Sequence, residues 1–230
     1  MPASIDAARA ELRALIEEGI EFPARPGMRD GSTPRRRSAV LILFGSLDRV
    51  SARAATPTVP LELDVLLMRR SDSLRHHAGQ VSFPGGGVEP GDTGPAHTAL
   101  REAAEETGLD PAGVEILGVL PDVPLAVSDN LVTPVIGWWT RPSAIAADDT
   151  ESVEVFRAPV AELLDPAARG TSVMRRDGTV FRGPAFDLEN GRILWGFTAI
   201  ILSTLFDRLG WAVPWDEGRI FPVTSGIRSN

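Results

Sequence analysis

The stretch FPGGGVEPGDTGPAHTALREAAEETGLD, residues Phe83 to Asp110, decides the fold, and its last third raises a question about charge. The segment REAAEETG places Glu102, Glu105 and Glu106 near the C-terminal end of one short predicted helix. That end carries partial negative charge from the backbone dipoles, which disfavours an acidic side chain by about 0.3–1 kcal/mol. Like charges four residues apart add a penalty of about 0.2–0.5 kcal/mol per pair. We therefore expect a positive group beside these carboxylates.

Turn-forming residues bound this predicted helix on both sides. Thr93 is the expected N-terminal cap, because its hydroxyl can accept a hydrogen bond from the first turn. Pro95 suits the first turn, where a missing N–H costs nothing. Gly108 is the expected left-handed residue that ends the helix after Thr107.

The composition indicates an ordinary globular protein, with 43% hydrophobic and 23% charged residues in a chain of 230. A chain of this length suits one domain, so we expect a single domain over 1–230, with an N-terminal helix and linker over 1–37 and a tail over 216–230. A net charge of −8 argues against a general nucleic-acid or anionic-membrane binder, because those surfaces are polyanions. Cysteine is absent, which excludes disulfides, a thiolate nucleophile and a cysteine zinc site, and fits a cytoplasmic location.

Helices are expected at both ends of the chain. The first 19 residues form an amphipathic pattern interrupted by acids, which predicts a helix rather than a secretory signal. Its apolar face is expected to contain Ala7, Ala10, Leu12, Leu15 and Ile16. A mostly buried helix is predicted over Ile193 to Leu209. Its apolar run, Ile193 to Phe206, is shorter than the roughly 20 residues needed to span a bilayer, so no membrane segment is expected.

Strands are predicted between these helices, separated by loops and by one short helix near 160–164. The predicted strands are 38–44, 63–69, 114–120, 131–139 and 151–159, followed by a hairpin over 175–182 around Asp177-Gly178. The segment 121–130 is expected to be a loop. Strands that alternate with helices favour an α/β sandwich.

The three glutamates are spaced for metal binding. Residues three and four positions apart share a helix face, so Glu102 lies beside both Glu105 and Glu106. Clustered carboxylates suit Mg²⁺ or Mn²⁺ rather than zinc. The alternative is a solvated acidic face without a ligand, and the surrounding spacing decides between the two.

That spacing resembles the Nudix box, which reads Gly, five residues, Glu, seven residues, then Arg-Glu-apolar-any-Glu-Glu-any-Gly-apolar. The matching positions are Gly87, Arg101, Glu102, Ala103, Glu105, Glu106, Gly108 and Leu109. One position departs, since Thr93 stands where the box has its first glutamate and Asp92 lies one place earlier. Whether an acid from this part of the loop supports the metal site is left open.

The resemblance implies a Nudix hydrolase with an α/β/α sandwich, a mixed β-sheet and a loop-helix-loop metal site. It implies a metal site of Glu102, Glu105, Glu106 and Gly87, which binds Mg²⁺ or Mn²⁺. Arg101 is expected to orient the glutamates. Such an enzyme hydrolyses a diphosphate linked to another group, and a bound divalent ion both neutralises the phosphates and lowers the pKa of a bound water.

A general base is still needed for the attacking water. The candidates are one of the helix glutamates and Glu151 or Glu154, which belong to a later segment that can fold back over the site. The expected catalytic set is therefore Arg101, Glu102, Glu105 and Glu151.

The run LLMRRSDSLRHHAGQVSFPGG, Leu66 to Gly86, resembles the signature of the coenzyme A diphosphatase subfamily. That signature reads Leu-Leu-Thr-any-Arg-Ser, three residues, Arg, three residues, Gly, three residues, Phe-Pro-Gly-Gly, and Met68 replaces its threonine. The resemblance implies cleavage of coenzyme A or acyl-coenzyme A into 3′,5′-ADP and 4′-phosphopantetheine. Arginine offers a planar fork for phosphate oxygens, so Arg70 and Arg75 are expected on the substrate side.

The glycines Gly85 and Gly86 are expected to let main-chain groups approach the substrate closely. The only partner expected is this small-molecule substrate, and a homodimer is one oligomeric state left open. Two rival functions remain. One is a Nudix diphosphatase of ADP-ribose, NADH or nucleoside triphosphates, and the other is a binding module that keeps the fold without catalysis.

Overall fold

The structure is a computed structural model, and it describes residues 4–23, 36–46, 52–53, 56–71, 79–125, 129–147, 152–176, 178–188 and 191–224. The helices are α1 (Ile5–Glu18), α2 (Pro95–Thr107), α3 (Val160–Leu163) and α4 (Phe197–Arg208), with a 3₁₀ turn η1 (Pro111–Gly113). The strands are β1 (Arg36–Gly45), β2 (Asp64–Arg70), β3 (Val81–Ser82), β4 (Gly85–Gly87), β5 (Val114–Val119), β6 (Val123–Leu125), β7 (Asn130–Trp139), β8 (Ser152–Pro159), β9 (Arg169–Arg176), β10 (Thr179–Leu188), β11 (Arg192–Leu194) and β12 (Ile220–Pro222). No helix in these ranges is long and apolar enough to cross a membrane.

The first eight strands form one mixed sheet. Its centre is the parallel pair of β1 and β7, while β2, β4, β5, β6 and β8 pair antiparallel with their neighbours. β1 and β2 pair only through 44–45 and 64–65, and the short strands β3 and β4 pair with their diverging parts. The sheet is therefore splayed, and the segment 81–87 lies between its two halves.

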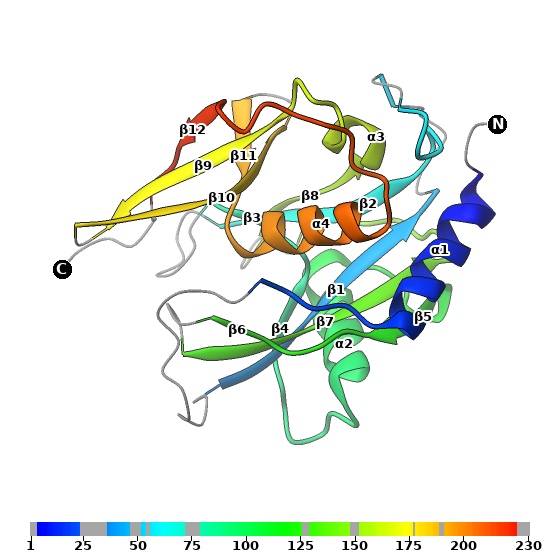
Figure 1. The fold of residues 1–230 in the computed structure, drawn as a ribbon. Coiled ribbons are helices and arrows are strands. Elements are labelled where there is room, and N and C mark those ends of the chain that lie inside the picture. Colours follow the sequence, from blue (N-terminus) through cyan, green and yellow to red (C-terminus); the bar gives the residue numbers. More distant parts are fainter. Residues whose placement is uncertain are drawn as a thin grey trace.

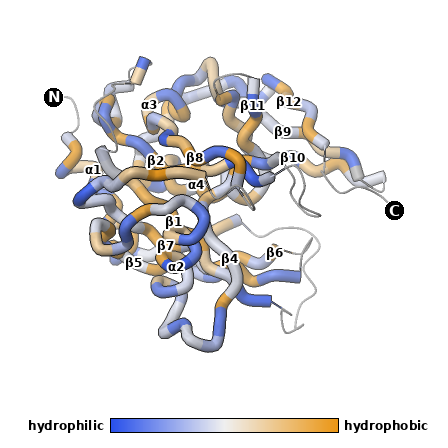
Figure 2. Tube along the Cα trace, turned by 180° about the vertical axis from the view of Figure 1, so that it is seen from behind, coloured by the Kyte–Doolittle hydropathy of each residue, from blue (hydrophilic) through white to orange (hydrophobic). Residues whose placement is uncertain are grey.

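Helices cover both faces of this sheet, as the α/β/α prediction requires (Figure 1). Alternate side chains of β1 divide between the two cores, because neighbouring residues of a strand point to opposite faces. Leu41 and Leu43 pack with Ala99 and Ala103 of α2, while Phe44 packs on the other face with α1, α4 and Trp211. Figure 2 shows hydrophobic stretches along these central strands and hydrophilic stretches at the chain reversals on the rim.

A second sheet, which the sequence did not predict, lies beside the first. Its order is β11-β10-β9-β12, with β12 parallel to β9 and the other pairs antiparallel. The predicted hairpin forms its middle pair, with Arg176 opposite Thr179, and Asp177 lies outside the described residues.

Several local predictions were wrong where tertiary pairing prevails over local pattern. Part of the expected loop 121–130 forms β6 on the edge of β7, and part of the expected tail 216–230 forms β12 on β9. The last helix begins at Phe197 rather than Ile193, because 192–194 pair with β10. In α1 the buried alanine is Ala8, and Ala10 is exposed.

The N-terminus of α2 also differs from its prediction. The capping residue is Gly94, without a side-chain hydrogen bond, so Thr93 is not the cap. Pro95 starts the helix and Gly108 ends it in the left-handed conformation with φ 67°, as predicted. Asp92 is the nearby residue whose side chain engages the first turn, through the hydroxyl of Thr98.

Candidate active site

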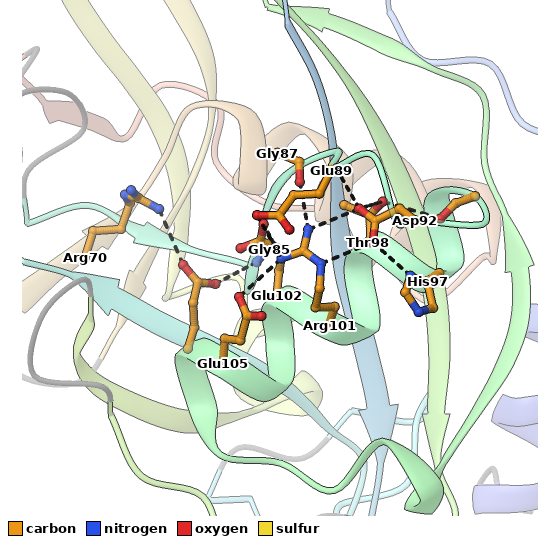
Figure 3. A network of polar contacts seen from close by, with 12 residues as sticks. Arg70, Gly85, Gly87, Glu89, Asp92, His97, Thr98, Arg101, Glu102 and Glu105 are labelled. Carbon is orange, nitrogen blue, oxygen red and sulfur yellow. Dashed lines mark hydrogen bonds and ion pairs between the residues drawn. The ribbon is translucent and has the colours of Figure 1, made fainter.

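Glu106 is buried beneath the glycine strand β4. Its side chain is 5% exposed, and its Oε2 accepts a hydrogen bond of 2.8 Å from the backbone N–H of Gly85. The guanidinium Nη1 of Arg70, at the end of β2, lies 3.9 Å from its Oε1 (Figure 3). A buried carboxylate needs such partners, because burying an isolated charge is costly.

Glu102 lies against the next glycine of the same strand. Its side chain is 16% exposed, and its Oε1 is 3.0 Å from Nη1 of Arg101. A Cβ atom placed on Gly86 would overlap the Glu102 carboxylate, and one placed on Gly85 would overlap the backbone of β1. These two positions therefore require glycine, because no other residue allows β4 to approach both α2 and β1 so closely.

Glu105 faces away from this contact. Its side chain is 60% exposed and its Oε2 accepts a hydrogen bond of 3.2 Å from Nη1 of Arg101. Across the ranges that the structure describes, no group of three or more His, Cys, Asp or Glu side chains is arranged to hold a metal ion by itself. The helix thus presents Glu102 and Glu106 toward β4, with Glu105 at the outer edge.

Arg101 joins the helix to the loop that precedes it. Besides the two glutamates, it donates from Nη2 to the backbone carbonyl of Gly87 at 2.9 Å and from both Nε and Nη2 to Asp92 at 3.1 Å (Figure 3). Hydrogen bonding to Asp92 raises the pKa of Arg101 above its usual range. Arg101 and Arg70 are the positive groups expected beside the acidic end of the helix.

Asp92 is the acid that the spacing pattern left in question. Its side chain is 1% exposed, and it accepts hydrogen bonds from Arg101, the hydroxyl of Thr98 and the backbone N–H of Glu89, while also pairing with the ring of His97. Arg101 is the main reason that the pKa of Asp92 lies well below its usual range, followed by the N–H of Glu89. Asp92 contacts Arg101 rather than the glutamates, so it positions them indirectly.

The donor set on α2 and β4 suits a hard divalent cation. Mg²⁺ is usually bound by one or two carboxylates together with substrate phosphates and waters, rather than by a complete protein cage. Glu102 and Glu106 lie against β4 and offer carboxylate oxygens, and Gly87 of that strand offers a carbonyl, although that carbonyl already accepts a bond from Arg101. The residues present therefore fit such an ion.

Glu151 and Glu154 are the two acids considered as general bases outside the α2 helix. Glu151 lies outside the described residues, and so does Arg75. Glu154 forms an ion pair with Arg192 and lies 3.9 Å from Nε of Arg69. Glu154 is thus already engaged by two guanidinium groups. The start of β8 nevertheless adjoins α2, because Ser152 Oγ donates to the backbone oxygen of Glu106 at 3.0 Å.

Comparison with known proteins identifies relatives over most of the chain. The NUDIX domain family model matches residues 51–175. A protein named uncharacterized Nudix hydrolase NudL from Escherichia coli O7:K1 is 36% identical over 167 residues, covering 71% of this chain and 86% of that protein. Its counterpart from Citrobacter koseri is 36% identical over 186 residues, covering 81% and 89%. A solved NUDIX hydrolase from Nitrosomonas europaea has a TM-score of 0.47 at 13% identity, covering 84% of this chain and 81% of that one.

Proposed function

Because this chain belongs to the Nudix hydrolase family, which acts on pyrophosphate bonds, we propose that its substrate is coenzyme A or an acyl-coenzyme A. Hydrolysis then releases 3′,5′-ADP and 4′-phosphopantetheine or its acyl form. One observation carries this proposal. The run from Leu66 to Gly86 resembles the coenzyme A diphosphatase signature. Two of its residues contact the carboxylate of Glu106, Arg70 through an ion pair and Gly85 through its N–H.

Nudix hydrolases generally use divalent metal cations, and we assign Mg²⁺ or Mn²⁺ to this site. Glu102 and Glu106 are its proposed side-chain ligands, with Gly87 as a carbonyl ligand and Glu105 at the outer edge. A cation there neutralises the diphosphate and lowers the pKa of a bound water. Arg101 holds Glu102 and the Gly87 carbonyl in place through the contacts described above.

The proposed substrate side consists of Arg70, Arg75 and the backbone of Gly85 and Gly86. Arg70 is close to the proposed ligand Glu106, so its guanidinium can transfer from that carboxylate to a phosphate oxygen when the substrate binds. Coenzyme A also carries a 3′-phosphate, and Arg75 is the proposed contact of that group. Glu105, the most exposed of the three α2 glutamates, and Glu151 stay the candidates for the base that takes a proton from the attacking water, whereas Glu154 contacts two arginines, Arg192 and Arg69.

Product analysis by mass spectrometry tests the proposal. The purified protein is incubated with Mg²⁺ or Mn²⁺ and, separately, with coenzyme A, dephospho-coenzyme A, ADP-ribose and NADH. We expect 3′,5′-ADP and 4′-phosphopantetheine to form fastest. Glu106→Gln should abolish this reaction, whereas Glu217→Gln, a matched change at an exposed residue far along the chain, should leave it intact.

The alternatives predict different products. Faster cleavage of ADP-ribose or NADH would support a pyrophosphatase activity but reject coenzyme A as the substrate. If Arg75→Ala loses no more activity on coenzyme A than on dephospho-coenzyme A, the proposed contact between Arg75 and the 3′-phosphate is rejected.

A further inference from the structure

A cavity of about 600 Å³ lies between the two sheets, beside the edge strand β8. Its described lining comes from β8, from α3 and the turn after it, and from β10 and β11, the elements labelled in the upper part of Figure 1, together with Arg53. Small-molecule sites have volumes of about 300–1,000 Å³. None of the α2 glutamates belongs to this lining, so the cavity is separate from the carboxylate site.

The cavity starts at the same strand ends as the carboxylate site. In the ladder between β2 and β8, Arg70 stands opposite Ser152 and Arg69 stands opposite Glu154. Arg70 pairs with Glu106 of α2, whereas Glu154 is part of the cavity wall. Among the described strands β8 pairs with β2 alone, so the carboxylate site and the cavity border the same pair of strands at the edge of the first sheet.

The charges of the lining do not suit a polyanion. Three arginines contribute to it, namely Arg53, Arg157 and Arg192. Four carboxylates oppose them, namely Glu154, Glu162, Asp165 and Asp187. Among the described lining residues, acids therefore outnumber bases by one, and Arg192 is already paired with Glu154. A nucleotide that carries an additional phosphate would be repelled more than attracted here.

The remaining lining suits a neutral chain that is partly apolar and rich in hydrogen-bonding groups. Phe156, Leu163 and Leu188 supply apolar walls, and the guanidinium of Arg192 lies 5.1 Å from the centre of the Phe156 ring. The carboxylates at the rim can accept hydrogen bonds from amide N–H groups, which bind without adding negative charge. Apolar walls with a few polar groups are typical of sites that bind organic ligands.

We propose that this cavity binds the amide-containing pantetheine arm of the substrate, while the nucleotide half stays on the Arg70 side of the carboxylate site. This inference rests on the proposed function and adds the direction in which the substrate lies. The scissile diphosphate spans Glu102 and Glu106, and the arm continues along β8 into the cavity. The β10–β11 part of the second sheet then serves as a wall of the substrate site.

Two substitutions that fill the cavity test this assignment. Ala168 lines the cavity, and Asp187 lies at its exposed rim. The backbone N–H of Asp187 donates to the backbone oxygen of Ala168, and both Ala168→Trp and Asp187→Trp retain that hydrogen bond. The matched control is Ala167→Trp, which adds the same ring at an exposed neighbour outside the described lining. Isothermal titration measures the binding of 4′-phosphopantetheine and of 3′,5′-ADP, so turnover is not needed.

We expect both cavity variants to bind 4′-phosphopantetheine at least about tenfold more weakly, with 3′,5′-ADP affinity unchanged. The control should match the wild type for both ligands. Asp187→Trp keeps the test valid if Ala168→Trp does not fold. Unchanged 4′-phosphopantetheine affinity in the folded variants, or loss of 3′,5′-ADP affinity instead, would overturn the assignment even if coenzyme A is hydrolysed. A wild type that does not bind 4′-phosphopantetheine would also overturn it, whereas failure of the proposed function itself appears separately in the product analysis.

Discussion

Arg101 donates hydrogen bonds to both carboxylate oxygens of Asp92, from Nε and Nη2, each at 3.1 Å. This two-point contact uses the planar fork of the guanidinium, which gives geometric specificity as well as energy. Asp92 is nearly inaccessible to solvent, so the pair fixes the direction in which Arg101 reaches the Gly87 carbonyl and Glu102. Asp92 is therefore a positioning residue for the carboxylate site.

Asp92→Asn should weaken the site without changing its shape greatly. The amide cannot accept two charge-assisted bonds, so Arg101 would lose its fixed orientation toward Glu102. Removing such an outer partner typically costs about 10–100-fold in metal affinity or activity. Electron paramagnetic resonance of bound Mn²⁺, together with kcat/KM, measures the effect, and Asp216→Asn at an exposed position provides the control. If Asp92→Asn keeps the wild-type Mn²⁺ binding and kcat/KM, Asp92 does not position the carboxylate site.

The same pair predicts how stability changes with acid. The pKa of Asp92 is lowered in the folded protein, so its contribution is complete above the ordinary value of 3.8 and is lost as pH falls through the lower folded value. Thermal unfolding of the wild type and of Asp92→Asn should therefore differ by a constant amount above about pH 5, and the difference should shrink in stronger acid. A difference that grows on acidification would contradict the assigned sign.

Gly86→Ala should disable the site through one methyl group. The added Cβ would overlap the carboxylate of Glu102, so either that side chain or β4 must shift. We expect Mn²⁺ affinity and kcat/KM to fall at least about tenfold, because catalytic groups tolerate little displacement. Gly91→Ala is the matched control, since a Cβ there has open space. Equal activity of the two variants would show that close approach at Gly86 is not required.

Arg70→Ala should separate metal binding from substrate binding. Arg70 and a cation compete for the Glu106 carboxylate, so removal of the guanidinium should tighten Mn²⁺ binding in the absence of substrate. The variant also loses a charged contact with phosphate, worth about 1.5–3 kcal/mol, so kcat/KM should fall by about tenfold or more. Titration of Mn²⁺ and steady-state kinetics measure the two effects, with Arg208→Ala at an exposed position of α4 as a control. Weaker Mn²⁺ binding would mean that Arg70 supports Glu106 instead of competing for it.

The general base is identified by comparing Glu105→Gln with Glu151→Gln. Loss of the base should lower kcat by about 10²–10⁴-fold while Mn²⁺ affinity changes little. The pH–rate profile of that variant should also lose its acidic limb. If neither variant shows this pattern, both candidates are rejected.

The long segments of the fold were predictable because their signals are local. β1 and β7 are runs of apolar residues bounded by polar segments, and α2 combines a helical period with Pro95 at its start and Gly108 at its end. The short strands β6, β11 and β12 were not predictable. Each contains three residues, too few to show a period. β6 and β11 exist by pairing with the longer strand next to them in the chain, and β12 exists by pairing with the distant strand β9.

The candidate site shows the same division between local and distant signals. Helical spacing alone groups Glu102, Glu105 and Glu106, but it could not tell that β4 buries Glu106 while Glu105 faces outward. The role of Asp92 was also hidden, since its contact with Arg101 spans nine residues and the turn before α2. Its only signal in the sequence was an acid one place before the expected glutamate.

The sequence by itself therefore determined the family, the acidic helix and the need for a positive group beside it, because these follow from spacing and charge along one segment. Only the tertiary structure decided that Arg70 meets Glu106 and where the second sheet encloses the cavity beside β8. Those relationships depend on the packing of segments far apart in the chain. No local periodicity encodes such packing, because it arises from burial and pairing across the whole fold.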